Sequence, residues 1–449
     1  MFFVRLLYLS LLILFLNTNL DAFERKLKLN EAIEIALKGN HEIRAFKNAL
    51  LSAKEDLSIS KSHLFPKLIF EERFMRTNNP TYSFMAKLNQ SRFSESDFHV
   101  PSLNNPKATN DFQSSIYFEQ PVFVKKIYVG IDMSKTELDS KRSSINRKKE
   151  EIILKILHAF SALSISKEYV SASQKSIDEA KEHLRIAELR YKNNLGLTSD
   201  VLRAQTALKE AEQNHLKSLK NLNVSKRALG VLLGLNESVD ILDDHLPLRL
   251  HPYDYYDKQS INRADISALK LKVENAKKNI TLSETDYYPI IGVGGGYQLN
   301  DHRMPFGSEG TSWQVTAFLR WNIFDGTKRE HERAKAKYLA QETMEHFEAM
   351  KKAVSYKVFE AYQDYESAKK AYEIALSALE SAEEGMRLVR VRYENALSPL
   401  VDLLSAQSSL DNARANLTAR KNDMNISMAN LAYESGILLK EFNMQQMEE

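Results

Sequence analysis

The chain has 449 residues, of which 27% are charged, and it contains only 14 glycines and 10 prolines, roughly half or less of average usage. The 62 lysines and arginines nearly cancel the 59 acidic residues, for a formal net charge of +3, which argues against nucleic acid as a partner because phosphate binding needs concentrated positive charge. Cysteine is absent, which excludes disulfide scaffolds, thiolate nucleophiles and cysteine-based metal sites.

Residues 1–22 have the features of a secretory signal peptide. Arg5 supplies the positive charge, Leu6 to Leu16 form an apolar core of about eleven residues, and Ala22 offers a cleavage site. The apolar run is shorter than the ~20 residues that cross a bilayer as a helix. We expect cleavage, after which the mature chain either leaves the membrane or crosses one as strands.

The residues that break helices are unevenly placed along the chain. There is no proline between Pro121 and Pro247 or between Pro305 and Pro399, and half of the glycines lie in the window 292–326. Proline and glycine disfavour helix interiors, so this placement predicts very long helices interrupted by short non-helical inserts. Apolar and small residues recur in these tracts at steps of three and four, which favours close helix-to-helix packing.

The chain contains an internal repeat. Residues 185–234 align without a gap with residues 387–436, and about a third of the positions are identical. The identical pairs include Tyr191 with Tyr393, Leu195 with Leu397, Asp200 with Asp402, Gln205 with Gln407, and Gly234 with Gly436. This pattern predicts a tandem duplication, in which each half runs helix, short insert, long helix, turn and long helix.

The repeat and the helix breakers together predict the organisation of the chain. The expected segments are the signal peptide (1–22), a first helical segment (23–65), a first strand pair with a long exposed loop (66–122), a long helical hairpin (123–234), a belt segment between the repeats (235–262), a second helical segment (263–288), a second strand pair (289–325), a second long hairpin (326–436) and a C-terminal tail (437–449).

Four short segments have the composition of strands: 67–75, 112–121, 290–299 and 313–324. The last alternates most clearly, with Trp313, Val315, Leu319 and Trp321 on one face and polar residues on the other. Its two tryptophans are eight residues apart, about 26 Å along a strand, which suits the two aromatic girdles of a membrane β-barrel. We therefore expect the strands to contact lipid, with Trp313 and Trp321 at the membrane interfaces.

Four strands are too few to close a barrel, because small closed barrels need about eight. An open sheet edge in lipid would leave backbone polar groups unpaired. If the strands enter the bilayer, identical copies must therefore share one barrel, and the protein must be an oligomer.

These features together resemble the TolC-like outer-membrane efflux protein family. The most specific parts are the motif from Tyr191 to Leu208, its copy from Tyr393 to Leu410, and Ile323-Phe324-Asp325-Gly326 after the last strand. The resemblance implies a mainly α fold with a small β part, in which long antiparallel hairpins form an α-barrel tunnel and each chain gives four strands to a shared trimeric outer-membrane β-barrel. It further implies a homotrimer in outer-membrane lipid, with a periplasmic adaptor (membrane-fusion) protein and an inner-membrane transporter as partners.

The resemblance also implies roles for residues at the helix turns. Asp402 falls at the carboxylate ring of the periplasmic aperture, Tyr393 at a linking tyrosine, and Asp200 at the acceptor of that link. The two turns would contact the adaptor through Leu195, Gly196, Leu397 and Ser398. Ser398 and Ser405 stand where the best-known member has a linking arginine and a second aperture aspartate, so we expect fewer links and a less acidic ring.

The sequence contains no recognisable catalytic, cofactor or metal motif. Gly292 to Gly296 superficially resembles a phosphate loop but lacks the following lysine and serine or threonine, and the histidines are scattered. The predicted function is a passive exit duct of a tripartite efflux or type I secretion system in a Gram-negative outer membrane. The alternative is a secreted or periplasmic coiled-coil scaffold or adhesin without channel activity.

Overall fold

The structure is a computed structural model that describes residues 25–242, 247–395 and 397–444, so the predicted signal peptide lies outside the described residues. The α-helices are α2 (Leu29–Gly39), α3 (His41–Ser62), α4 (Pro80–Asn89), α5 (Val100–Asn104), α6 (Lys125–Lys192), α7 (Thr198–Leu232), α8 (Tyr253–Ser260), α9 (Ala264–Glu284), α10 (Lys328–Glu394), α11 (Leu400–Glu434) and α12 (Leu438–Glu441). Two short 3₁₀ helices are η1 (Glu95–Phe98) and η2 (Thr285–Tyr287). The strands are β1 (Arg25–Leu27), β2 (Lys67–Thr77), β3 (Thr109–Phe123), β4 (Val239–Ile241), β5 (Ile290–Asp301) and β6 (Gly310–Arg320).

The long helices occupy the tracts that lack proline. Helices α6 and α10 have 68 and 67 residues, and helices α7 and α11 have 35 each. The two hairpins α6–α7 and α10–α11 therefore have matching lengths. Within the described ranges, no helix is both long enough and apolar enough to cross a bilayer.

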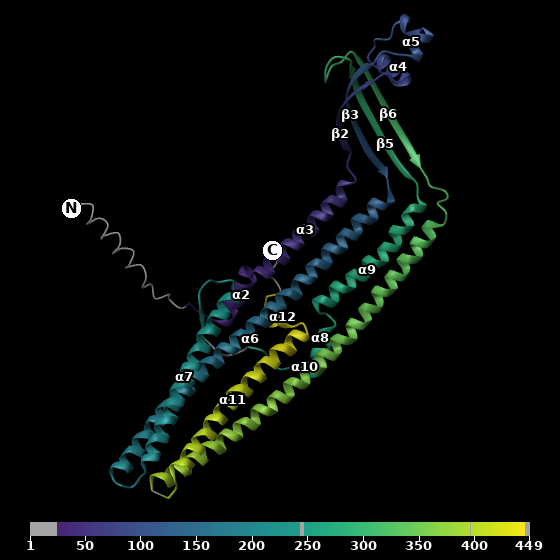
Figure 1. The fold of residues 1–449 in the computed structure, drawn as a ribbon. Coiled ribbons are helices and arrows are strands. Elements are labelled where there is room, and N and C mark those ends of the chain that lie inside the picture. The colour runs from purple at the N-terminus through teal and green to yellow at the C-terminus, as the bar shows by residue number, and fades with distance from the viewer. Residues whose placement is uncertain (1–24, 243–246, 396, 445–449) are drawn as a thin grey trace, which may run out of the picture. The chain divides into compact units, whose positions relative to one another are not determined.

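The chain forms two compact units, each built from separated stretches of sequence. The first unit takes in the described parts of 1–49, 142–268 and 348–449, and the second takes in 50–141 and 269–347. The first is helical apart from the short parallel pair of β1 with β4, whereas the second holds a four-stranded antiparallel sheet. Figure 1 shows the elements of each unit.

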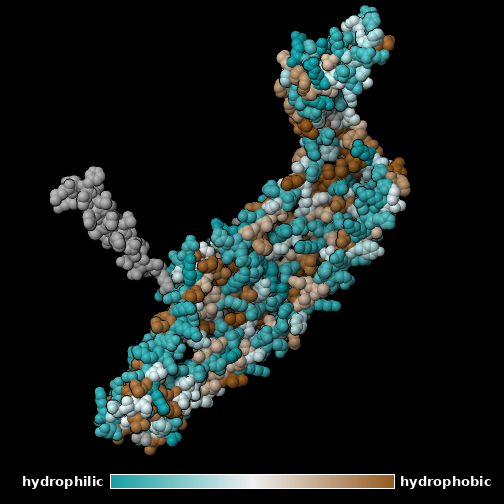
Figure 2. Space-filling model, viewed as in Figure 1, coloured by the Kyte–Doolittle hydropathy of each residue, from teal (hydrophilic) through white to brown (hydrophobic). Residues whose placement is uncertain are grey.

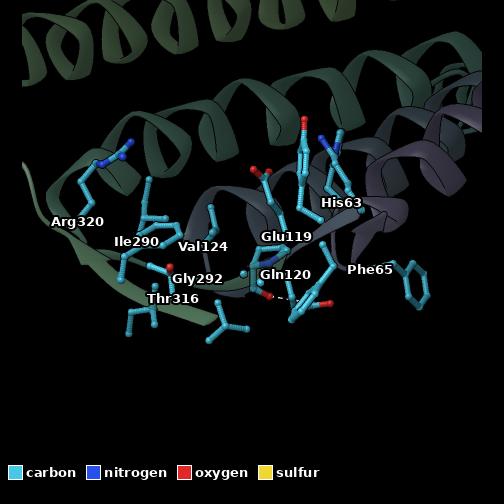
Figure 3. A pocket seen from close by; sticks show the side chains of 18 of the residues that line it. His63, Phe65, Glu119, Gln120, Val124, Ile290, Gly292, Thr316 and Arg320 are labelled. Carbon is cyan, nitrogen blue, oxygen red and sulfur yellow. Dashed lines mark hydrogen bonds between the residues drawn. The ribbon is translucent and has the colours of Figure 1, made fainter. Parts of the chain in front are cut away.

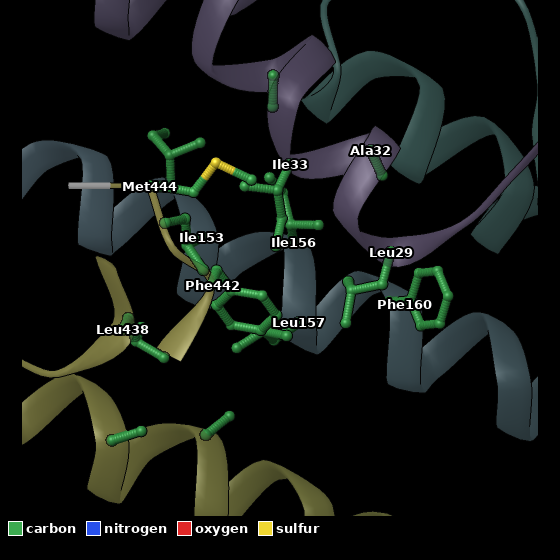
Figure 4. Packing of buried hydrophobic residues seen from close by; sticks show 14 of the residues in the cluster. Leu29, Ala32, Ile33, Ile153, Ile156, Leu157, Phe160, Leu438, Phe442 and Met444 are labelled. Carbon is green, nitrogen blue, oxygen red and sulfur yellow. The ribbon is translucent and has the colours of Figure 1, made fainter. Parts of the chain in front are cut away.

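The core of the first unit lies where short elements pack on the middle of the long helices. Figure 4 shows Ile33 of α2 close to Ile156 of α6, and Leu157 of α6 close to Phe442, which follows α12. Each fully buried side chain of this size contributes about 1.5–3 kcal/mol. The short elements therefore fasten the two hairpins together.

Two equivalent contacts join the ends of the hairpins to the helices that precede the two strand pairs. The amide nitrogen of Asn40, just before α3, donates to the carbonyl oxygen of Leu232 at 2.9 Å. Arg263, just before α9, donates to the carbonyl oxygen of Glu434 at 2.9 Å. Both contacts satisfy carbonyl groups at the C-terminal end of a hairpin helix, which otherwise lack partners.

The sheet of the second unit has the strand order β2-β3-β5-β6, and every neighbouring pair is antiparallel. Its four strands coincide with the four segments that the sequence predicts. Strands β2 and β6 are its edges, so one side of each has no hydrogen-bonded neighbour strand among the described residues. The sheet is open.

The connection between β2 and β3 differs from the exposed loop that we predict from its asparagines, serines and prolines. It folds into α4, η1 and α5. Pro80 occupies the first turn of α4, and the side chain of Asn79 accepts a hydrogen bond from the backbone of Tyr82 at 3.3 Å. Proline and asparagine here start a helix, which is a role that both residues favour at helix N-termini.

The last strand is also shorter at its end than the predicted segment 313–324, because β6 stops at Arg320. The guanidinium of Arg329 in α10 donates to the carbonyl oxygens of Asn322 at 3.0 Å and Ile323 at 2.8 Å. A side chain therefore satisfies these backbone groups in place of a neighbouring strand. Trp321 consequently lies just beyond β6.

We predict that Gly234→Ala destabilises the helical unit by about 1–3 kcal/mol. Gly234 has a φ of +78°, and a Cβ there would lie 2.9 Å from the carbonyl oxygen of Gly39. Thermal unfolding of the purified protein in detergent, followed by circular dichroism at 222 nm, measures the effect. Gly385→Ala in α10 is the matched control, since its Cβ would meet no described atom within 4 Å. It should be neutral or stabilising by about 1 kcal/mol; equal losses for both variants would contradict the prediction.

Candidate functional site

One face of the four-stranded sheet is an exposed apolar surface. Residues paired directly across neighbouring strands share a face, and the registers bring large apolar residues from all four strands together. This apolar face consists of Leu68, Phe70, Ile116, Phe118, Tyr297, Trp313, Val315 and Leu319, all of them exposed. Figure 2 shows apolar side chains gathered on the sheet near its junction with its helices. A soluble protein rarely exposes such a continuous patch, so a partner or lipid covers it.

The opposite face of the sheet is mainly polar, although Ile69, Ile290 and Phe318 also lie on it. It includes Lys67, Glu71, Arg73, Tyr117, Glu119, Gln298, Gln314, Thr316 and Arg320. Its members pair with one another: the Tyr117 hydroxyl donates to Glu71 at 2.7 Å, and Arg73 donates to Gln113. Charged residues in β2 are difficult to reconcile with lipid contact when only the sequence is considered. In the structure most of them lie on the face opposite the apolar face.

The two tryptophans lie near different ends of β6. Trp313 is paired across the sheet with Tyr297, and its side chain is 77% exposed. The indole nitrogen of Trp321 donates to the carbonyl oxygen of Tyr287 at 3.1 Å. Each ring thus presents an apolar body to the surroundings, as aromatic residues do at membrane interfaces.

The glycines of β5 leave room for two aromatic rings. A Cβ at Gly292 would lie 2.6 Å from the ring of Phe318, and a Cβ at Gly295 would lie 2.8 Å from the ring of Phe118. These glycines permit close packing of rings against the backbone on both faces of the sheet. No following helix and no lysine convert the run into a phosphate site.

A concavity of about 800 Å³ lies on the polar face where the strands join their helices. Figure 3 shows Glu119 and His63 toward one end of this hollow and Arg320 at the other. Its floor is the backbone of β5 from Ile290 to Gly295. Acidic and basic side chains therefore line the concavity, and glycines of β5 lie at its floor.

The tips of the two hairpins contain a second, small core. Tyr393, which is 2% exposed, packs with Ala187, Ala204, Met386, Leu400, Leu403 and Leu410. Figure 1 shows the turns of the two hairpins side by side at one end of the helical unit. The predicted linking tyrosine is thus a buried residue at the contact between the hairpins.

An arginine that the sequence reasoning missed links the hairpins at this core. Arg190 at the end of α6 lies over the ring of Tyr393, 4.6 Å from its centre, and donates to the Tyr393 carbonyl oxygen at 3.1 Å. Burial raises the pKa of the Tyr393 hydroxyl, and nearby Arg190 opposes that shift while Asp200 adds to it. Among the described residues, no hydrogen bond joins Tyr393 to Asp200.

The predicted aperture and turn residues lie at the surface of the tips. Asp402 is exposed in the first turn of α11, and Asp200 is half-buried in the first turn of α7. The turns expose Leu195 and Leu397 to a large extent. Gly196 and Ser398 are half-buried, while position 396 lies outside the described residues.

A buried polar network connects α6 with α11 further along the hairpins, and nothing in the sequence pattern points to it. Nε2 of His183, a residue 3% exposed, lies 3.3 Å from the amide oxygen of Gln407. The amide nitrogen of Gln407 donates to Glu179 at 2.6 Å, and Arg414 pairs with Glu179 at 3.2 Å. Because the Gln407 oxygen can only accept, Nε2 of His183 carries a proton in this contact, while Nδ1 is buried and has no hydrogen-bond partner among the described residues.

One cluster has residue types that bind metals. Asp301, His302 and Glu309, in the connection from β5 to β6, have ligand atoms within 4.8 Å of one another. Both carboxylate oxygens of Glu309, Nδ1 of His302 and Oδ1 of Asp301 already have protein partners. Burial would raise the pKa of Glu309, but hydrogen bonds from His302 and Arg303 hold it at about 2. The carboxylate of Asp301 accepts from the backbone of Arg303 at 2.6 Å. The cluster closes the turn by itself.

Comparison with protein families gives a match over most of the chain. Residues 32–235 and 256–436 match the family described as outer membrane efflux protein. The chain therefore belongs to the outer membrane efflux protein family. This confirms the resemblance seen in the sequence, together with the predicted outer-membrane location. The family is not a family of enzymes.

Individual relatives are distant in sequence. Protein CyaE of Bordetella pertussis is 22% identical over 293 residues, which are 63% of this chain and 61% of that protein. The match thus spans less than two-thirds of CyaE.

Solved structures share the fold at low sequence identity. A structure of CusC has a TM-score of 0.76 at 14% identity, covering 92% of this chain and 93% of that one. The outer membrane protein VceC of Vibrio cholerae has a TM-score of 0.73 at 16% identity, covering 91% of this chain and 96% of that one. The CmeC outer membrane channel of Campylobacter jejuni has a TM-score of 0.72 at 16% identity, covering 91% of this chain and 85% of that one. These likenesses confirm the mainly helical fold with a small β part.

We predict that the helical unit loses stability as the pH falls below about 6.5, where histidine in an unfolded chain gains its proton. Burial lowers the pKa of His183, and the hydrogen bond to Gln407 only partly offsets this effect. The unfolded chain therefore binds the proton first, so the contribution of His183 to stability is constant above this pH and declines below it. Unfolding midpoints between pH 7.5 and 5 measure the trend. His183→Gln should flatten it, whereas His346→Gln, at an exposed position, should not. A pH dependence equal in both variants would assign the trend to other groups.

Proposed function

We propose that the protein is the passive exit duct of a tripartite efflux or type I secretion system. In this role a homotrimer passes small molecules, metal ions or polypeptides through the periplasm and the outer membrane. The observation that supports it best is the open sheet with one apolar and one polar face. Lipid covers the apolar face, and the polar face borders a water-filled pore.

The open edges of the sheet explain why several copies must assemble. In hydrocarbon, each unpaired backbone N–H or C=O group costs several kcal/mol. The free edge of β6 in one copy pairs with the free edge of β2 in the next, and the ring closes when no edge remains. Three copies give twelve strands, enough for a closed barrel with an aqueous interior.

The hairpin tips form the periplasmic entrance in this proposal. Copies of Asp402 around the symmetry axis concentrate negative charge, which favours cations at the aperture. Tyr393 and Arg190 hold the two hairpins of one chain together, and Asp200 lies beside this contact. Opening requires the hairpins to separate, so these contacts set the resting state.

The partners follow from the surfaces that remain uncovered. The exposed Leu195 and Leu397 at the turns, with Gly196 and Ser398, provide an apolar contact for the periplasmic adaptor, which connects the duct to the inner-membrane transporter. The duct itself needs no catalytic group and no cofactor, because the transporter supplies the energy. A coiled-coil scaffold or adhesin is the weaker candidate, since it gives no reason for the exposed apolar face of the sheet.

The first test is the assembly state and conductance of the purified protein. We expect detergent-extracted protein to form particles of three copies and to produce discrete conductance steps in planar lipid bilayers. A mature protein that stays monomeric in detergent-free buffer and conducts nothing would contradict the duct and support the scaffold.

The second test concerns the link at the hairpin tips. Arg190→Ala removes a cation–π contact and a hydrogen bond, together worth about 1–2 kcal/mol per copy. The open population should therefore rise about tenfold or more, which single-channel recording measures as open probability. Arg185→Ala is the matched control, because Arg185 is exposed and pairs with Glu182 of the same helix at 2.6 Å. An unchanged open probability for Arg190→Ala would remove this residue from the gate.

A further inference from the structure

The segment between β2 and β3 is a small folded element with its own internal contacts. The rings of Phe84, Phe93 and Phe98 pack edge to face, with centres 4.8 and 5.4 Å apart. The ammonium of Lys87 in α4 pairs with Asp97 in η1 at 2.6 Å. This bond and the backbone N–H of Ser94 hold the pKa of Asp97 at about 2. The segment therefore has a defined shape rather than that of a loose loop.

The end of α4 is anchored on the polar face of the sheet. Gln90 is fully buried, and its amide nitrogen donates to the carboxylate of Asp111 at 2.8 Å. Asn300 of β5 donates to the same oxygen at 2.9 Å. The strand registers place Asp111 and Asn300 on the same face as Arg73 and Glu71. Helix α4 thus lies against the pore side of the proposed barrel, not against its lipid side.

The fit at β6 supports the same placement. A Cβ at Gly310 would overlap the carbonyl oxygen of Asn89, the last residue of α4. Gly310 is paired with Asn300, so it belongs to the polar face too. The helix end therefore touches β3, β5 and β6 on one face, at the end of the sheet away from the helices that its strands join, as Figure 1 shows.

The two sides of α4 differ in burial. Ser83 and Ala86, which are spaced with Gln90 along one side of the helix, are buried. Met85 and Leu88 point to the other side and remain exposed. With one side fixed to the wall, the opposite side turns toward the space that the polar face encloses. Two apolar side chains per copy therefore project toward the pore axis.

We propose that α4 forms an apolar constriction at the outer end of the pore, lined by Met85 and Leu88 of each copy. This inference rests on the proposed trimeric duct. An apolar ring disfavours water and ions, because their hydration is lost without replacement by polar groups, and a narrow ring of this kind lowers conduction by partial dewetting. The exit thus has a barrier of its own, separate from the periplasmic aperture. A transported molecule must either displace the α4 helices or bring water into the constriction.

Cysteine accessibility tests this placement, because the chain has no cysteine of its own. The probe is a positively charged, water-soluble methanethiosulfonate reagent, added from the outer side of a planar bilayer to Met85→Cys protein. We expect an irreversible change in the single-channel conductance, because the attached charged group alters both the width and the hydration of the constriction. Val315→Cys is the matched control, since Val315 is 71% exposed on the apolar face and should be shielded by lipid.

A second variant tests the apolar character of the ring. Met85→Ser with Leu88→Ser keeps the anchor at Gln90 and should raise the resting conductance, because polar side chains keep the constriction hydrated. Conductance that is insensitive to the reagent in the Met85→Cys protein and unchanged in the serine variant would overturn the constriction while leaving the duct intact. The absence of any conductance from the unmodified protein would instead overturn the duct, and the constriction with it.

Discussion

The backbone groups along the free edges of β2 and β6 constrain everything else that this protein does. Four antiparallel strands with one apolar face satisfy only the groups inside the sheet, and hydrocarbon offers no water to satisfy those at its edges. A membrane position and an assembly of several copies are therefore one requirement, not two.

The helical unit solves a different problem, because long helices with few large apolar residues bury little surface each. Their contacts combine small residues with polar links. At the middle, short elements fill the core around Ile156 and Phe442; at the tips, a cluster around Tyr393 is joined by the cation of Arg190. The tip has the smaller core, so the hairpins separate there at lower cost than at the middle.

Sequence patterns predicted the elements that depend on local periodicity. The long helices followed from missing prolines, and the strands followed from alternation such as that from Trp313 to Leu319. Contacts that depend on which elements become neighbours were not predictable. Gln90 looks like an ordinary polar loop residue until α4 lies on β3, and Arg190 looks like one more surface charge until α10 packs beside α6. The three-residue strands β1 and β4 are too short to show any period.

The bare backbone of β5 has a consequence for the path of a transported molecule. Gly294 and Gly296 belong to the polar face, where they place no side chain between Glu119 and Thr316 or between Tyr117 and Gln314. Each copy therefore offers a shallow niche at that level, floored by peptide groups. If three such niches surround the axis, the passage is widest at the level of these glycines and narrowest at its outer end.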